Sequence, residues 1–98
     1  MTRNFTDLTG KKAIVTGGAQ GLSFGMAEGL MEAGAQVCII DVNPAVIQVA
    51  ETFVQRGFCC FGVTADLGDG KKLKEGFVQA VEKLGGHLDI LVNGAGVQ

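Results

Sequence analysis

Residues 12–23 read KAIVTGGAQGLS, and this stretch decides the fold. Its first five residues are an apolar run of the kind that forms a buried strand, and the glycines after it mark a turn. From Gly21 onward the apolar residues take helical spacing, at Leu22, Met26, Leu30 and Ala33. The stretch therefore predicts a strand, a glycine-rich turn and a helix, and Gly34 is expected to end that helix.

The same alternation continues along the rest of the chain. Residues 36–41, 58–63 and 88–92 are apolar runs that predict three more strands, the first of them buried on both faces. A helix is expected between the first two, with Asn43 as its N-cap, Pro44 at its first position and Gly57 after its end. Another is expected between the last two, where the apolar residues are Leu73, Phe77, Ala80, Val81 and Leu84.

Strands that alternate with helices predict an α/β protein, in which right-handed crossovers build a parallel sheet covered on both faces. An open doubly wound sheet of the Rossmann type has two halves and binds ligands where the strand order reverses. Residues 1–98 supply the first half and the opening strand of the second. We therefore expect the N-terminal part of a single Rossmann-type domain, whose fourth strand pairs with the first and leaves a bare apolar edge.

Composition excludes several classes of function. The 98 residues include no tyrosine, so a mechanism that needs a phenol as acid or base cannot run on this chain alone. A net charge of −2 argues against nucleic-acid partners, and the three cysteines, in apolar runs, are expected to be reduced core thiols. With one histidine and no C-x-x-C, a metal site is not expected. No apolar segment suits a signal peptide or a membrane span, so we expect a cytoplasmic protein.

The glycine-rich turn is a candidate phosphate site. A helix N-terminus presents unpaired N–H groups and a partial positive charge, and glycines let a ligand approach the backbone closely. A plain strand-to-helix connection would also explain the glycines. The candidate residues for binding a cofactor here are Gly17, Gln20, Gly21, Leu22 and Ser23.

Asp41 favours a dinucleotide in particular. It stands 20 residues after Gly21, at the end of the second predicted strand, where a carboxylate accepts hydrogen bonds from a ribose diol and repels a 2′-phosphate. NAD is therefore the expected cofactor. The alternative is that Asp41 is a loop acid or a helix cap before Asn43-Pro44.

Two later segments belong to the same edge of the predicted sheet. Asp66 follows the third strand, where its side chain could reach an adenine ring, although it could equally be a loop aspartate before Gly68. Residues 93–96 read NGAG and follow the fourth strand. Small residues there suit a thin wall beside a cofactor, and they suit an ordinary turn nearly as well.

Together these motifs resemble those of the short-chain dehydrogenase/reductase family, over the whole chain. Residues 16–23 are similar to the family's T-G-x-x-x-G-x-G loop, and Asp66-Leu67 looks like its adenine-contacting pair. Residues 93–96 are similar to its N-N-A-G motif, which adds Asn93, Ala95 and Gly96 to the candidate cofactor-binding residues.

By that resemblance the intact protein would be an NAD-dependent enzyme that interconverts a secondary alcohol and a ketone. It would be a homotetramer acting on a small molecule, with the sugar-acid dehydrogenases of the gluconate type as the suggested subgroup. The family's catalytic serine and Y-x-x-x-K pair would lie beyond Gln98, so no catalytic residue is assigned and the 98-residue chain is expected to be inactive.

The sequence departs from the family pattern at two positions. Ser23 stands where the family usually has a third glycine, and Gly94 where it usually has a second asparagine. The Ser23 hydroxymethyl group could bond to a diphosphate or crowd it, and Gly94 removes an amide that could hold neighbouring strands.

Two other functions remain open at this point. A methyltransferase that uses S-adenosylmethionine also has acids after its second and third strands, although the glycine spacing fits a dinucleotide better. A non-catalytic nucleotide-binding or assembly module would share the same motifs without a catalytic half.

Overall fold

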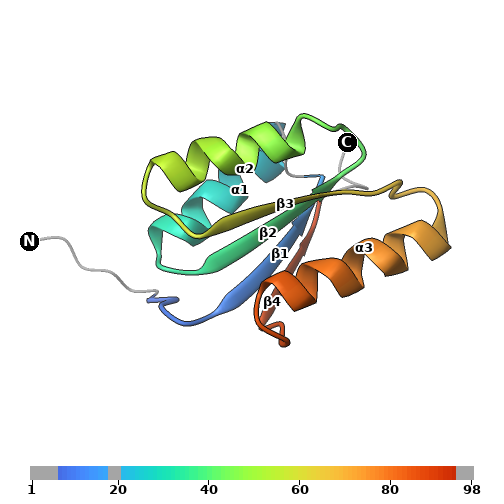
Figure 1. The fold of residues 1–98 in the computed structure, drawn as a ribbon. Helices are drawn as coiled ribbons and strands as arrows, with labels where there is room; N and C mark the ends of the chain where they lie inside the picture. The colour runs from blue at the N-terminus through green and yellow to red at the C-terminus, as the bar shows by residue number, and fades with distance from the viewer. Residues whose placement is uncertain (1–6, 18–20, 95–98) are drawn as a thin grey trace, which may run out of the picture.

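The computed structural model describes residues 7–17 and 21–94, apart from the side chain of Leu22 (Figure 1). Four strands alternate with three helices, as expected. The strands are β1 (Lys12–Thr16), β2 (Gln36–Asp41), β3 (Cys60–Thr64) and β4 (Ile90–Asn93). The helices are α1 (Gly21–Glu32), α2 (Val46–Gln55) and α3 (Gly70–Lys83).

The four strands form one parallel sheet in the order β3-β2-β1-β4. Val15 of β1 lies opposite Ile39 of β2 on one side and Val92 of β4 on the other. The predicted Rossmann-type sheet is therefore confirmed, and so is the pairing of the fourth strand with the first. Within the described chain β4 is an edge strand, and its Leu91 side chain is 51% exposed.

Each face of the sheet carries its own core. Figure 1 shows α1 and α2 on one face and α3 on the other. Because side chains alternate along a strand, Val37 and Ile39 pack under α1 and α2, whereas Cys38 and Ile40 pack under α3. All four are fully buried, which explains why β2 is apolar at every position between Gln36 and Asp41.

Glycines end the helices as the sequence predicts. After α1, Gly34 has a φ of +107°, its N–H donates to the Met31 carbonyl (3.0 Å), and the Ala35 N–H donates to Leu30 (3.0 Å). This is the Schellman arrangement, in which a residue with positive φ turns the chain and satisfies the last carbonyls.

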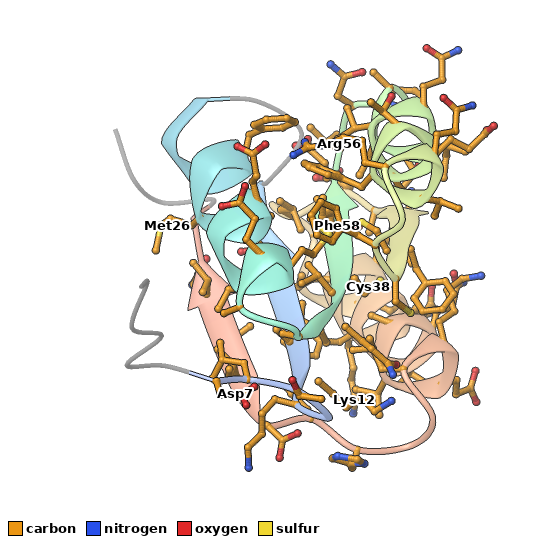
Figure 2. All side chains as sticks on the ribbon, turned by 90° about the vertical axis from the view of Figure 1, so that its left-hand side faces the viewer. Asp7, Lys12, Met26, Cys38, Arg56 and Phe58 are labelled. Carbon is orange, nitrogen blue, oxygen red and sulfur yellow. The ribbon has the colours of Figure 1, made fainter. Side chains whose placement is uncertain are left out.

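The predicted apolar face of α1 is only partly correct: Leu30 packs against the core, but the buried residues lie one position further along the chain than predicted. Met26 was expected in the apolar stripe, but it is 43% exposed, and Figure 2 shows it on the side of α1 that is turned away from α2. The buried residues of α1 are Ser23, Ala27 and Met31. Apolar or small residues of α1 lie on several sides of the helix, so their spacing in the sequence does not show which side faces the core. The small Ala27 packs in the core instead, and the Phe24 ring lies beside that of Phe53, with the centroids 5.1 Å apart and the planes tilted by 33°.

Arg56 connects α1 to the end of α2. Its guanidinium lies 2.7 Å from the Glu28 carboxylate and stacks over the rings of Phe53 and Phe58, at 5.3 and 5.2 Å from their centroids. Figure 2 shows Arg56 and Phe58 side by side at this junction. Glu28 is thus part of a contact between α1 and the end of α2.

The starts of three elements also differ from the prediction. The α2 helix begins at Val46, two residues after Pro44, because the Asn43 side chain accepts from the Ala45 N–H (2.9 Å) in a turn that precedes the helix. β3 begins at Cys60 since the Phe58 N–H caps α2 through the Phe53 carbonyl (3.1 Å). β4 begins at Ile90, where pairing with Ala13 starts.

The cysteine prediction holds for two of the three thiols. Cys38 and Cys60 are free and buried, and burial raises the pKa of each thiol to about 12. Cys59 is also free but exposed, because it precedes β3 and does not point into the core. No helix in the described ranges is long and apolar enough to cross a membrane.

Candidate functional site at the carboxyl edge of the sheet

The carboxyl ends of the four parallel strands meet at one edge, where loops converge on a pocket of about 350 Å³. The pocket is lined by Gly17, Asp41, Val42, Asp66, Leu67, Gly68 and Gly94. Four of the predicted site residues, Gly17, Asp41, Asp66 and Leu67, therefore come together around one cavity. Such an edge is where doubly wound proteins bind ligands.

The turn from β1 to α1 uses two glycines for their backbone freedom. Gly17 and Gly21 have φ values of +70° and +72°, which L side chains rarely adopt. The Gly17 N–H donates to the Ile40 carbonyl (2.7 Å) and extends the β1–β2 ladder. The Gly17 N–H is therefore already used within the sheet. Gln20 lies outside the described residues, as do Ala95 and Gly96.

Asp41 is held firmly at the end of β2. Its side chain accepts from the Asn43 N–H (3.0 Å), and its carbonyl accepts from the Ala65 N–H (3.0 Å). The residue is only 9% exposed, and it lines the pocket. The two interpretations of Asp41 are thus compatible, because it makes the loop hydrogen bond and still lies beside the cavity.

Asp66 and Leu67, which follow β3, also line the pocket. The Asp66 carboxylate accepts from the Gly68 N–H (2.9 Å), which is the loop role considered for it above, while the residue itself is exposed. Leu67 is half-buried against the core under α3. The pair offers a carboxylate and an apolar surface side by side.

Thr16 joins the ends of β1 and β4, a role that sequence reasoning missed. Its hydroxyl donates to Asn93 Oδ1 (3.0 Å), and the Gly94 N–H lies within bonding distance of both the Thr16 carbonyl (3.0 Å) and the hydroxyl (3.2 Å). The residue is 4% exposed. A polar side chain at the end of an otherwise apolar strand was the available signal, because a buried hydroxyl needs a partner.

Negative charge predominates in this pocket. Asp41 and Asp66 both line it, and no lysine or arginine is among its described lining residues. Lys72 lines an adjoining pocket of about 360 Å³ that shares Val42 and Asp66. In the parts of the chain that the structure describes, no cluster of three or more His, Cys, Asp or Glu residues could hold a metal ion.

A larger groove of about 670 Å³ lies elsewhere, along α3. It is lined mainly by apolar side chains, among them Leu73, Phe77 and Val81, and includes none of the predicted site residues. The chemistry of the chain is therefore gathered at the smaller, more polar pocket.

Comparison with known proteins identifies the family. A family model described as short chain dehydrogenase matches residues 11–98. The chain belongs to the short-chain dehydrogenase family. Members are oxidoreductases that use nicotinamide nucleotides, so the resemblance inferred from the motifs is confirmed and the methyltransferase alternative is not favoured.

Curated relatives agree with this family. Oxidoreductase UcpA of Escherichia coli is 39% identical over 90 residues, which cover 92% of this chain and 34% of the relative. Mouse 15-hydroxyprostaglandin dehydrogenase [NAD(+)] is 38% identical over 93 residues, with the same coverage of 92% and 34%. The chain thus spans about a third of the length of these relatives.

Solved structures of related proteins match the fold of this chain. A hydroxysteroid dehydrogenase from Escherichia coli superposes with a TM-score of 0.83 at 35% identity, covering 92% of this chain and 38% of that one. A short-chain dehydrogenase/reductase from Serratia marcescens gives 0.81 at 34% identity, covering 89% and 36%.

Proposed function

We propose that this chain is the NAD-binding portion of an oxidoreductase that interconverts a secondary alcohol and a ketone. The observation that carries the proposal is the convergence of Gly17, Asp41, Asp66 and Leu67 on one pocket at the carboxyl edge of the sheet. When bound, NAD supplies the hydride acceptor. The residues of this chain bind and orient it.

Each part of the dinucleotide has a counterpart at this edge. The start of α1 would receive the diphosphate through the N–H groups of its first turn, to which Gly21, Leu22 and Ser23 belong, and Gln20 precedes that turn in the sequence. Asp41 would accept hydrogen bonds from the adenosine ribose, and Asp66 with Leu67 would flank the adenine. Asn93 at the end of β4, with Ala95 and Gly96 after it in the sequence, would form the wall beyond the diphosphate.

Charge favours NAD over NADP. The 2′-phosphate of NADP would face Asp41 in a cleft that is also lined by Asp66, and like charges at short range repel strongly where water is partly excluded. We therefore expect NAD to bind roughly ten-fold or more tightly than NADP, about 1.4 kcal/mol. The mouse relative named above as using NAD(+) is consistent with this choice.

Two substitutions separate the charge of Asp41 from its loop role. Asp41→Asn keeps an oxygen that accepts from the Asn43 N–H but removes the negative charge, whereas Asp41→Ala removes both. Both variants should weaken NAD binding, and both should reduce the ratio of the affinity for NAD to the affinity for NADP by about ten-fold. The measurement is calorimetric titration of each cofactor into the full-length protein. An unchanged ratio in both variants would mean that Asp41 is not at the ribose, and an absence of NAD binding to the wild type would contradict the proposed function.

The finer features of the intact enzyme are also proposals. We expect a homotetramer in the cytoplasm with a small-molecule alcohol or ketone as its substrate, and an inactive 98-residue chain, because the sequence contains no tyrosine. A sugar acid is the suggested substrate. A structure from Agrobacterium tumefaciens that is provisionally named a gluconate dehydrogenase, with a TM-score of 0.77 at 36% identity, supports testing this subgroup first.

A further inference from the structure

Ser23 and Gly94 lie far apart in the sequence but share one small space in the fold. A Cβ atom added to Gly94 would come within 2.9 Å of the Ser23 Cβ and still closer to the Ser23 hydroxyl oxygen. It would also lie 2.8 Å from the Thr16 carbonyl oxygen. Real Cβ atoms essentially never approach other heavy atoms closer than 3.0 Å. The Ser23 side chain therefore fills the volume into which a side chain at position 94 would project.

The glycine at position 94 is required by space and not by backbone conformation. Gly94 is not among the residues with positive φ, whereas Gly21 has a φ of +72° and open space around an added Cβ. Gly29, on the outer side of α1, has neither constraint, because its φ is ordinary and no atom lies within 4 Å of an added Cβ. Substitution at these three glycines should therefore have three different effects.

Ser23 belongs to the first turn of α1, and Gly94 follows the last residue of β4. We infer that the two residues are a matched pair that sets the distance between the start of α1 and the end of β4. A single side chain, that of Ser23, occupies the space between them. Ser23 is 7% exposed and its hydroxyl faces Gly94, so it acts as a spacer and is a positioning residue.

The inference rests on the proposed function where it concerns cofactor binding. A second side chain in the shared space would push the first turn of α1 away from β4. The N–H groups proposed to receive the diphosphate would move with it, while Asp41 and Asp66, which are fixed by β2 and β3, would stay in place. The pair should therefore affect binding of the diphosphate more than binding of the nucleoside.

A double-mutant cycle in the full-length protein tests the pair. The proteins are wild type, Ser23→Gly, Gly94→Ala and the double variant, with Gly29→Ala as the control. Gly94→Ala should weaken binding of NAD and of ADP by about ten-fold or more and leave adenosine binding within about two-fold. In the Ser23→Gly background the same change should weaken NAD and ADP binding at least about three-fold less than it does in the wild type, because the overlaps with the Ser23 side chain are gone while the overlap with the Thr16 carbonyl oxygen (2.8 Å) is common to both backgrounds. Gly29→Ala should change none of these constants.

Urea unfolding of the same five proteins separates the possible failures. Gly94→Ala should lower the midpoint more in the wild-type background than in the Ser23→Gly background, whether or not NAD binds. If the two substitutions are coupled in urea unfolding but the wild type does not bind NAD, the proposed function is contradicted and the inference that Ser23 and Gly94 share one space still holds. If Gly94→Ala lowers the urea midpoint equally in both backgrounds, the inference that Ser23 and Gly94 form a matched pair is wrong. If Gly94→Ala does not fold, a folded double variant supports the pair, and failure of both variants to fold overturns it.

Discussion

β2 and β4 belong to the same sheet but are held in it very differently. β2 pairs with neighbours on both sides and its residues from Val37 to Ile40 have no exposed surface. β4 pairs only with β1 within the described chain, and its residues alternate between half-buried and exposed. The packed core thus fixes β2 and the Asp41 at its end. β4 and the Gly94 that follows it are positioned by hydrogen bonds to β1 and by the half-buried Ile90 and Val92, which pack against the core under α1 and α2.

The largest effects are therefore expected in β2. Ile39→Ala removes a fully buried side chain and should lower the free energy of unfolding by about 2–5 kcal/mol, and Ile39→Val by about 0.5–1.5 kcal/mol. Leu91→Ala in β4, where the residue is 51% exposed, should change it by about 0.5 kcal/mol or less. Urea unfolding of the 98-residue chain measures all three. A loss at Leu91 equal to that at Ile39 would show that β4 is packed as tightly as β2.

An intermediate effect is expected at Thr16, which joins the end of β4 to β1. Thr16→Val keeps the shape of the side chain but removes the hydroxyl that bonds to Asn93 and Gly94. The loss should be about 1 kcal/mol of unfolding free energy, because the Gly94 N–H keeps the Thr16 carbonyl as an acceptor. Thr16→Ser retains the hydroxyl and is the control.

Amide hydrogen exchange locates that effect. In Thr16→Val the protection of the Gly94 amide should fall while that of the Ile39 amide changes only by the global loss of stability. If both amides lose protection equally, Thr16 supports the whole sheet and has no special link to β4.

The same contrast explains how much of the structure the sequence predicts. The bounds of β1 and β2 follow directly from their sequences, because each is an unbroken apolar run with a glycine or a charged residue at its end. The starts of β3 and β4 do not, because Phe58 is used to cap α2 and Leu88 packs under α3 before pairing begins. Apolarity marks burial, whereas strand pairing depends on partners elsewhere in the chain.

The candidate site divides in a similar way. Gly17, Asp41 and Asp66 were predictable because each closes or follows a strand, and parallel strands bring their carboxyl ends to one edge. The contact between Ser23 and Gly94 was not predictable from the sequence. Each residue departs from the family pattern separately, and only the fold shows that the two departures occupy the same space.

The smallest expected effect is at the other end of β4, where Asp89 fastens the strand to β1. Its carboxylate accepts from the Lys12 N–H (2.9 Å), and its own N–H donates to the Lys12 carbonyl (2.8 Å).

The bond from Lys12 lowers the pKa of the Asp89 carboxyl from its ordinary value of 3.8; burial opposes this, and the charges of His87 and Lys11 assist it. Because the pKa is lowered in the folded state, the stabilisation is complete above pH 3.8 and is lost as the pH falls through the folded value. Asp89→Asn should therefore make unfolding less dependent on pH in this acidic range and reduce protection of the Lys12 amide at neutral pH. Asp7→Asn is the matched control, since the pKa of Asp7 is also lowered, and the hydrogen bonds that lower it come from Thr9, outside the sheet. It should flatten the acid dependence without exposing the Lys12 amide, and equal exposure in both variants would mean that Asp89 does not fasten β4 to β1.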